Sequence, residues 1–305
     1  MRYAFAPMVD ASALAIGSPR TWRIVDRGEE EAWFGVQVVG NDPGRIARAA
    51  ERLSTLRPTV MDLNLGCPAP KVRRKGQGCS LVEHPDLVAS CVRAMAGASS
   101  APVTVKMRLT PEATAAPVIE AIRSAADAGA VAATVHGRTP RQHYGGPVHL
   151  DVLAEIVRAS PVPVIANGGI HSRWHLERMV REVRPHAVML ASGVIGNPWL
   201  FGALEGPPPW GDGPLPADPW PDPTPSPGEL AEVLVEHVEA TVDHHGRSLG
   251  YARSRKLVLR YLKGRGLPAS LRTMASRLSS RQDLDGIARA ILGCASLRPR
   301  AAPVA

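Results

Sequence analysis

The sequence lacks the features that mark several classes of protein. No apolar run in its 305 residues comes near the roughly 18 residues that a membrane-spanning helix needs. The apolar stretch at the N-terminus is too short for a signal peptide and soon meets a proline. The four cysteines, Cys67, Cys79, Cys91 and Cys294, form no CxxC pair, which argues against a zinc ribbon or a disulfide framework. We therefore expect a cytoplasmic protein with no membrane partner and no metal site, in which any functional cysteine acts as a thiol.

The composition indicates a folded chain with a local excess of positive charge. Hydrophobic residues make up 45% of the chain and charged residues 21%, which excludes a wholly disordered protein. The length suggests one large domain and a smaller one. The formal net charge is +8, and residues 246–281 contain ten basic residues and no acidic one. This stretch indicates a polyanionic partner more strongly than the net charge alone does.

Short apolar runs alternate with longer helical stretches from residue 3 to residue 190. Most of the runs are apolar almost throughout, as expected for parallel strands that are buried on both faces. The predicted strands are Tyr3–Met8, Trp33–Val39, Thr59–Asn64, Val103–Met107, Ala132–His136, Val162–Ala166 and Ala187–Leu190. The predicted helices between them are Pro43–Leu56, Pro85–Ala96, Ala116–Ala128, Leu150–Ala159 and Arg173–Val183.

Polar or glycine-rich residues follow the end of each predicted strand. A doubly wound sheet gathers its ligands at one switch point, whereas a (β/α)8 barrel gathers loops from every strand at one face. The sequence therefore favours an α/β fold of the TIM-barrel type. Only seven strands are predicted, and the segment 11–31 offers no more than the weak candidate Arg23–Val25. The sequence therefore leaves open whether the barrel lacks one β/α unit.

Proline marks the end of the predicted barrel. Ten of the 21 residues from Pro207 to Pro227 are proline, which is incompatible with helix interiors and central strands. We predict a barrel domain over residues 1–206, an extended linker over 207–227 and a basic helical domain over 228–305. The helices predicted in the last domain are Gly228–His245, Leu249–Lys263, Ser270–Leu278 and Asp283–Leu292.

The end of the third predicted strand carries an amide and a thiol. Asn64 and Cys67 reach the rim of the barrel there, in a turn that contains glycine and proline. The alternative interpretation is a small structural cysteine in a tight turn. The basic residues Lys71, Arg73 and Arg74 follow at once, and a mobile basic loop beside a thiol suits polyanion binding close to chemistry.

Two further strand ends carry cations and aromatic rings. Lys106 and Arg108 alternate along one strand, so both side chains point the same way, into the barrel mouth. His136, Arg138 and Tyr144 follow the next strand and add an imidazole, a guanidinium and a phenol. This combination predicts an anionic or electron-rich ligand.

Glycine-rich turns end the last two predicted strands. Asn167 to Gly169 follow one strand and Ala191 to Gly193 follow the other. Glycines there let backbone N–H groups approach a phosphate, and TIM barrels often bind a phosphate at this position. Each turn is a weak signal by itself, and the two in this order are more specific.

In this order the motifs resemble those of bacterial tRNA-dihydrouridine synthases. The likeness runs from Ala6 to Leu292 and is most specific at the GCP and HGRT segments. The matching segments are APMV (6–9), VQVVG (36–40), DLNLGCP (62–68), KVRRKGQG (71–78), VKMR (105–108), VHGRT (135–139), IANGG (165–169), NPWLF (197–201) and RKLVLRYLKG (255–264).

The resemblance implies a flavin barrel joined to a helical tRNA-binding domain, in a monomer that reduces a specific uridine of tRNA with NADPH. It implies Cys67 as the general acid that protonates uracil, on the face opposite a reduced flavin inside a closed barrel. The implied FMN-binding residues are Pro7, Met8, Val9, Gln37, Lys106, His136, Asn167, Gly168, Gly169, Ala191, Ser192 and Gly193. The implied uridine-binding residues are Asn64, Arg108, Arg138 and Tyr144. The implied tRNA-binding residues are Lys71, Arg73, Arg74, Arg253, Lys256 and Arg260.

The chain departs from the family pattern at two places. The segment between residues 12 and 35 is short by one helix and strand, and ASG at 191–193 replaces a usual GRG, which removes an arginine. Two alternatives therefore stay open beside the tRNA reductase. One is a different FMN barrel that oxidises or reduces a small molecule, and the other is a non-catalytic tRNA-binding relative that has lost its flavin.

Overall fold

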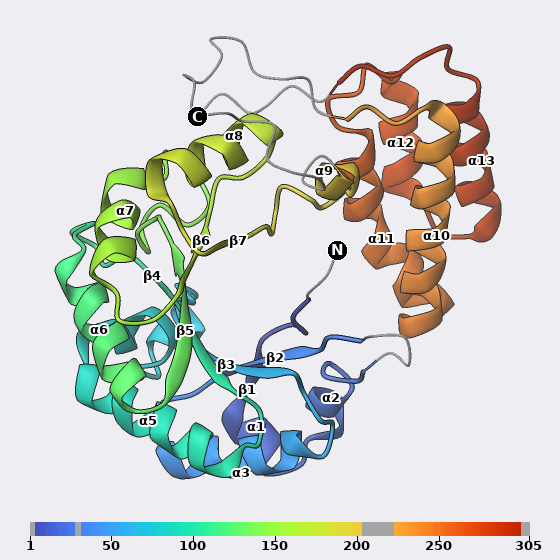
Figure 1. Ribbon diagram of the computed structural model, residues 1–305. Helices are drawn as coiled ribbons and strands as arrows, with labels where there is room; N and C mark the ends of the chain where they lie inside the picture. The colour runs from blue at the N-terminus through green and yellow to red at the C-terminus, as the bar shows by residue number, and fades with distance from the viewer. Residues whose placement is uncertain (1–3, 28–31, 203–222, 300–305) are drawn as a thin grey trace. The chain divides into compact units, whose positions relative to one another are not determined.

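Parallel strands and their connecting helices make up the first part of the computed structural model, which describes residues 4–27, 32–202 and 223–299. Each strand pairs in parallel with the next one along the chain, from β1 to β7 (Figure 1). The strands are β1 (Val9–Asp10), β2 (Gly35–Val39), β3 (Val60–Leu65), β4 (Val103–Arg108), β5 (Ala130–His136), β6 (Val164–Asn167) and β7 (Ala187–Met189). Within the described residues the sheet has seven strands in the order of a TIM-type barrel, which confirms the predicted fold class.

The sheet is curled but open. Within the described residues β1 and β7 each pair with one neighbour only, so the closed barrel implied by the resemblance is not observed. The strand predicted at Tyr3–Met8 is largely wrong, since β1 begins at Val9 and an isolated bridge from Phe5 to Gly35 precedes it. Residues 1–3 lie outside the described residues.

The weak strand candidate Arg23–Val25 is also wrong. Pro19 begins a short helix, α2 (Pro19–Trp22), because proline suits the first turn of a helix. The chain then continues in turns, in which Ile24 N–H donates to Thr21 O and Val25 N–H donates to Trp22 O. This local hydrogen bonding leaves the segment without a strand pairing among the described residues.

Helices cover the outer side of the curled sheet (Figure 1). They begin where the sequence offers a cap: the carboxylate of Asp10 accepts from Ser12 N and Ala13 N, and that of Asp42 accepts from Arg45 N. The helices are α1 (Ala11–Ala15), α2, α3 (Pro43–Ser54), α4 (Pro70–Arg73), the 3-10 helix η1 (Gly78–Glu83), α5 (Pro85–Ala98), α6 (Ala116–Asp127), α7 (Leu150–Ala159), α8 (Arg173–Arg178) and the π-helix η2 (Met179–Val183). The helix predicted at 173–183 is thus α8 followed by η2.

The two faces of the sheet differ in chemistry. In β3, Met61, Leu63 and Leu65 are fully buried, and they alternate with Asp62 and Asn64. Successive side chains of a strand point to opposite faces, so the apolar residues share the helix-covered face. The polar residues of β3 therefore lie on the inner face of the sheet.

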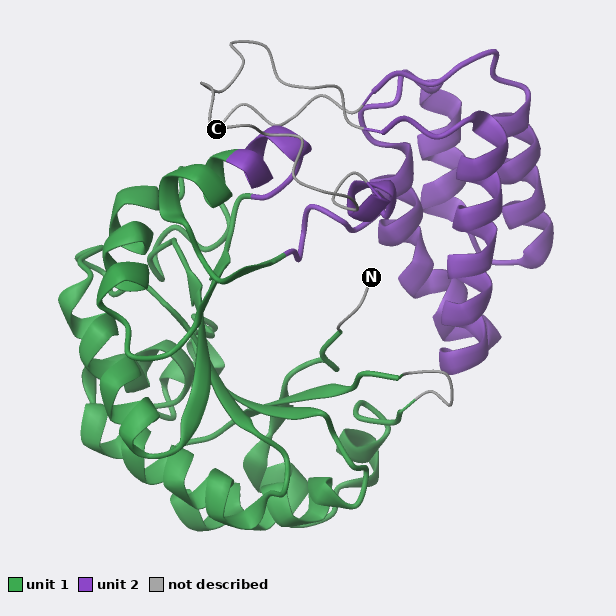
Figure 2. Ribbon diagram, in the orientation of Figure 1, with its two compact units in different colours: residues 1–169, 178–189 green, residues 170–177, 190–305 purple. Residues whose placement is uncertain are grey.

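The described chain divides into two compact units (Figure 2). The first contains residues 1–169 and 178–189, and the second contains residues 170–177 and 190–305. Most of the predicted linker, residues 207–222, lies outside the described residues. The helices of the second unit after residue 190 are α9 (Trp199–Gly202), α10 (Pro227–His245), α11 (Arg247–Leu262), α12 (Ala269–Arg277) and α13 (Arg281–Leu292).

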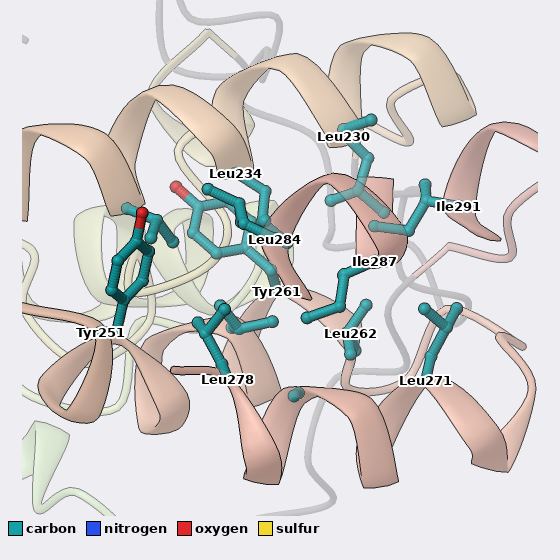
Figure 3. Close-up of a cluster of buried hydrophobic side chains, with 14 residues drawn as sticks. Leu230, Leu234, Tyr251, Tyr261, Leu262, Leu271, Leu278, Leu284, Ile287 and Ile291 are labelled. Atoms are coloured by element: carbon teal, nitrogen blue, oxygen red, sulfur yellow. The ribbon is translucent and has the colours of Figure 1, made fainter. Parts of the chain in front are cut away.

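The second unit has its own hydrophobic core, and two of its helices have strong N-terminal signals. Ser226 and Ser280 form capping boxes with Glu229 and Asp283, in which each partner accepts from the backbone of the other. The core packs between α10, α11, α12 and α13 (Figure 3). Its large members are Leu230, Leu234, Tyr251, Tyr261, Leu262, Leu271, Leu278, Leu284, Ile287 and Ile291. In the described part of the chain, no helix has the length and apolar character that a membrane crossing requires.

Candidate active site

The register of neighbouring strands lines up polar side chains in rows across the inner face of the sheet. Residues that pair in register point to the same side of a parallel sheet, so each row brings side chains from different strands together. Nearly all of these side chains are buried. The rows are Gln37–Asp62–Thr104 from β2, β3 and β4; Asn64–Lys106–Thr134 from β3, β4 and β5; and Arg108–His136–Asn167 from β4, β5 and β6.

Hydrogen bonds join the first two rows. Asp62 Oδ1 accepts from Thr104 Oγ1 at 2.7 Å, and Asp62 Oδ2 accepts from Gln37 Nε2 at 2.8 Å. Gln37 Oε1 in turn accepts from Asn64 Nδ2 at 2.8 Å. The buried carboxyl of Asp62 is thereby connected to Asn64 through one amide.

Asn64 holds the turn that presents Cys67. Its Oδ1 accepts from Gly66 N at 3.1 Å and from Cys67 N at 2.9 Å. The carbonyl of Cys67 accepts from Cys79 N at 3.2 Å, and a Cβ on Gly78 would lie 2.6 Å from that carbonyl oxygen. Gly78 also has a φ of +63°, so this close approach requires glycine. The half-buried thiol of Cys67 is thus fixed from both sides of its turn.

Arg108 ties the same turn to the next loop. It is 4% exposed, and its Nε donates to Gly66 O at 2.6 Å. Its Nη1 donates to Thr139 O at 3.0 Å and to His143 O at 3.4 Å. Arg108 therefore binds backbone carbonyls of both rim loops that flank the site.

Half-buried Lys106 lies close enough to the buried carboxyl of Asp62 for each group to influence the pKa of the other. Burial lowers the pKa of Lys106, and the nearby Asp62 opposes that shift. Burial raises the pKa of Asp62 to about 6, against the hydrogen bonds from Thr104 and Gln37 and the charge of Lys106. Lys106 Nζ lies 3.4 Å from Asn167 Oδ1, whose amide Nδ2 donates to Met189 O at 2.7 Å. A pKa of about 6 leaves the carboxyl of Asp62 mostly ionised at neutral pH.

The imidazole of His136 is neutral, and one of its ring nitrogens forms no hydrogen bond with the described residues. Burial, reinforced by Lys106, Arg108 and Arg138, lowers the pKa of its imidazole to about 3. Its Nε2 is buried and finds no hydrogen-bond partner among the described residues. A Cβ on Gly168, which has a φ of +116°, would lie 2.6 Å from His136 Cδ2. The glycine turn after β6 therefore lies directly against the imidazole.

Comparisons with known proteins agree with this arrangement. The family model described as "Dihydrouridine synthase" matches residues 2–294. The chain belongs to the dihydrouridine synthase family. This match confirms both the predicted family and the expectation of an enzyme of this class.

Individual members of the family match most of the chain. The "Probable tRNA-dihydrouridine synthase" of Treponema pallidum is 33% identical over 65% of this chain, which spans 62% of that protein. The "tRNA-dihydrouridine synthase B" of Xanthomonas axonopodis is 31% identical over 87% of this chain and 80% of that protein. Its Pseudomonas aeruginosa namesake is 32% identical over 90% of this chain and 78% of that protein. A solved nitroalkane oxidase from Streptomyces ansochromogenes matches 61% of this chain and 57% of its own at 18% identity and a TM-score of 0.36, which supports no conclusion about function.

The residues of the inner face fit the flavin that family resemblance implies. His136 Nε2 is a buried polar atom without a partner, and the turn at Gly168 and Gly169 forms a cradle that a Cβ would fill. The cations Lys106, Arg108 and Arg138 outnumber the carboxylate of Asp62. A ligand with heteroaromatic edges and an anionic group is therefore complementary to this face.

Two predicted rim residues lie beside this cluster. Arg138 Nε donates to Gly146 O at 2.9 Å, and its Nη2 would lie 3.5 Å from a Cβ on Gly169. The ring of Tyr144 stacks on that of His136 with centroids 6.3 Å apart, and Tyr144 is 72% exposed. The other face of its ring is therefore exposed to solvent.

Other predicted residues lie elsewhere. Pro7, Met8 and Val9 precede or begin β1, and Val9 pairs with Val38 next to Gln37. Ala191, Ser192 and Gly193 belong to the second unit, where a Cβ on Gly193 would lie 1.9 Å from Ile170 O. Lys71, Arg73 and Arg74 are exposed on or directly after α4. Arg253, Lys256 and Arg260 are exposed along α11, three and four residues apart, and so share one face of that helix.

Sequence reasoning named no role for Asp62, Thr104 or Thr134. The spacing of the residues could have drawn attention to two of them. Asp62 stands two residues before Asn64, and Thr104 stands two residues before Lys106. Two-residue spacing in a strand places both side chains on one face. Which strands face each other in register decides the contacts, and that came only from the structure.

The buried carboxyl makes a prediction about stability. The native state holds the proton of Asp62 more tightly than the unfolded chain, so its contribution to stability is complete below about pH 4 and is lost as the pH rises through about 6. Asp62→Asn removes this loss, so the stability of the variant relative to wild type should rise by about 2 kcal/mol from pH 4 to pH 7. The opposite contribution of His136 is present in both proteins and cancels. Urea unfolding at both pH values measures the difference, and an equal difference at the two would contradict the buried charge.

Proposed function

We propose that this chain reduces a specific uridine of tRNA to 5,6-dihydrouridine, with FMN as cofactor, NADPH as reductant and Cys67 as general acid. The observation that carries the proposal is the connection of the Cys67 turn, through Asn64, to the buried rows that contain Lys106 and His136. A thiol and a ligand-binding face are thereby held in one rigid cluster. The residues proposed to hold FMN are Pro7, Met8, Val9, Gln37, Lys106, His136, Asn167, Gly168, Gly169, Ala191, Ser192 and Gly193.

The reaction adds a hydride and a proton across a double bond. FMN, when bound, supplies hydride chemistry at C6 of the uracil ring. The Cys67 thiol gives its proton to C5, and the resulting thiolate takes up a proton from solvent before the next turnover. Asn64, Arg108, Arg138 and Tyr144 are proposed to hold the uridine. Lys106 places a fixed positive charge where negative charge develops in the site.

The substrate must leave the tRNA stack to reach a buried site, which costs a few kcal/mol. Contacts to phosphates can offset this cost without reading sequence. Two clusters of exposed basic residues are proposed to make these phosphate contacts. One is Lys71, Arg73 and Arg74 beside the Cys67 turn, and the other is Arg253, Lys256 and Arg260 on α11. The domain limits of 1–206, 207–227 and 228–305 remain part of this proposal.

The α11 face can be tested by a triple variant. Replacing Arg253, Lys256 and Arg260 by Ala should weaken tRNA binding about tenfold or more at low salt and reduce its salt dependence, because fewer phosphates are neutralised. Reduction of the bound flavin by NADPH should stay unchanged. Filter binding at several salt concentrations and anaerobic flavin reduction measure the two effects. A fall in flavin reduction would show that α11 is not a separate tRNA surface.

The function itself is tested by the mass of tRNA nucleosides from cells that lack the gene. We expect one uridine that lacks two hydrogens relative to the parent strain, restored when the gene is returned. A flavin-containing protein with unchanged tRNA would favour a reductase of small molecules. A protein purified without flavin absorbance would favour a non-catalytic tRNA-binding relative.

A further inference from the structure

The hydrogen bonds between Asp62 and the Cys67 turn form a chain in which each donor and each acceptor is determined. The backbone N–H groups of Gly66 and Cys67 can only donate, so the Asn64 atom that faces them must be Oδ1. The other amide atom of Asn64, Nδ2, is then a donor and must face the oxygen of Gln37. Gln37 is left with Nε2 as a donor at its far end. The chain of bonds therefore has to end on an acceptor.

Asp62 is that acceptor. Its carboxylate has no donor hydrogen when ionised, and it lies 1% exposed with Gln37 on one oxygen and Thr104 on the other. A hydrogen bond to a charged acceptor is roughly twice as strong as one between neutral groups. Asp62 thus strengthens a chain of bonds whose direction is set by the N–H groups of Gly66 and Cys67.

We propose that Asp62 is a positioning residue for Cys67. It acts through Gln37 and Asn64 and does not itself touch the reacting atoms; the inference rests on the proposed function, in which Cys67 is the acid. With Asp62 ionised, Asn64 keeps its oxygen toward the Cys67 turn and its amide toward Gln37. The thiol is then held where it can reach the substrate.

An amide at position 62 weakens this chain of bonds. The Oδ1 of an asparagine there would still accept from Gln37 Nε2, but as a neutral acceptor and not as a charged one. The reversed chain does not form, because it would bring the NH2 group of Asn64 against Gly66 N and Cys67 N. The bonds therefore keep their direction but lose strength, and the turn that they hold opens more often.

The test compares Asp62→Asn with wild-type protein as purified, at pH 8. Amide hydrogen exchange at Gly66 and Cys67 should become about tenfold faster in the variant, which corresponds to one weakened hydrogen bond. Exchange in α10 and α11 should stay the same. The kcat for dihydrouridine formation should fall about tenfold with the KM for tRNA unchanged, because the loss lies in the placement of the acid and not in binding.

Thr104→Val is the matched control. It removes the other hydrogen bond to Asp62 but leaves the carboxylate facing Gln37, so exchange at Gly66 and Cys67 and the ratio of kcat to KM should stay near wild type. Equal exchange rates in Asp62→Asn and wild type, or an equal loss in Thr104→Val, would overturn the proposal. If Asp62→Asn does not fold, Gln37→Met breaks the same chain at its middle and must give the same faster exchange. Hydrogen exchange needs no turnover, so it decides the role of Asp62 even if wild-type protein forms no dihydrouridine and the proposed function fails.

Discussion

Cys67→Ser should lower the rate of dihydrouridine formation by a factor of about 10² to 10⁴ and leave the FMN content unchanged. An alcohol is a much weaker acid than a thiol, so serine fills the position without supplying the proton. The turn itself should survive, because Asn64 holds it through backbone N–H groups and not through the thiol. Single-turnover reaction of the prereduced variant with tRNA measures the chemical step without interference from NADPH.

Cys79→Ser is the control for this experiment. Cys79 lies on η1, and only its backbone N–H bonds the Cys67 carbonyl, a bond that serine keeps. Burial raises the pKa of the Cys79 thiol, as expected for a cysteine with a structural role. The control should react like wild type. Equal turnover of Cys67→Ser, or an equal loss in Cys79→Ser, would remove Cys67 as the general acid.

Lys106→Met should lower the affinity for FMN by a factor of about 30 or more, because removal of a buried charged partner costs about 2 kcal/mol or more. Methionine has a similar length and fills the buried space beside Asn167, so the strand should remain intact. It leaves the carboxyl of Asp62 without its nearest positive charge, so the pKa of Asp62 should rise further. The ratio of flavin to protein absorbance after purification, and titration of the apoprotein with FMN, give the change in affinity.

Lys71→Met provides the comparison for Lys106→Met. Lys71 carries the same charge but is exposed on α4, outside the rows of the inner face. Its FMN content should match that of wild type. If Lys106→Met keeps full flavin occupancy, Lys106 does not hold the cofactor and the assignment of the inner face is wrong.

The sequence predicted the parts of the fold that depend on local composition. Strands β2 to β7 were predicted because each is a short apolar run between helical stretches, and α7 was placed at its observed ends. The strand at Tyr3–Met8 was misplaced, because its apolar character does not tell which of its residues pair with β2. The candidate Arg23–Val25 failed because Pro19 begins a helix and turns follow it.

The candidate site depended on information of two kinds. Asn64, Cys67, Lys106 and His136 stand out in the sequence because each is a polar residue or a thiol within two residues of the end of a buried strand. The role of Asp62 could not be predicted in this way, since it depends on the register that sets Gln37 opposite Asp62 and Asp62 opposite Thr104. The alternation of residues within one strand does not predict how that strand aligns with its neighbours, so contacts between strands cannot be predicted from it.

The missing strand does not interrupt the polar rows of the inner face. The opening of the sheet lies between β1 and β7, whereas the polar rows run across β2 to β6, where every strand pairs with both neighbours. Asn167 also bonds the backbone of β7 at Met189, which ties the last row to the edge strand. A seven-stranded sheet can therefore keep the inner face that the chemistry needs.

The absorbance of bound flavin during one anaerobic turnover tests the central claim most directly. The holoenzyme is reduced with NADPH and then mixed with tRNA from cells that lack the gene. We predict that the absorbance of oxidised flavin returns as the tRNA gains dihydrouridine, in equal amounts. Flavin that stays reduced in the presence of this tRNA, or a purified protein without flavin, would contradict the account.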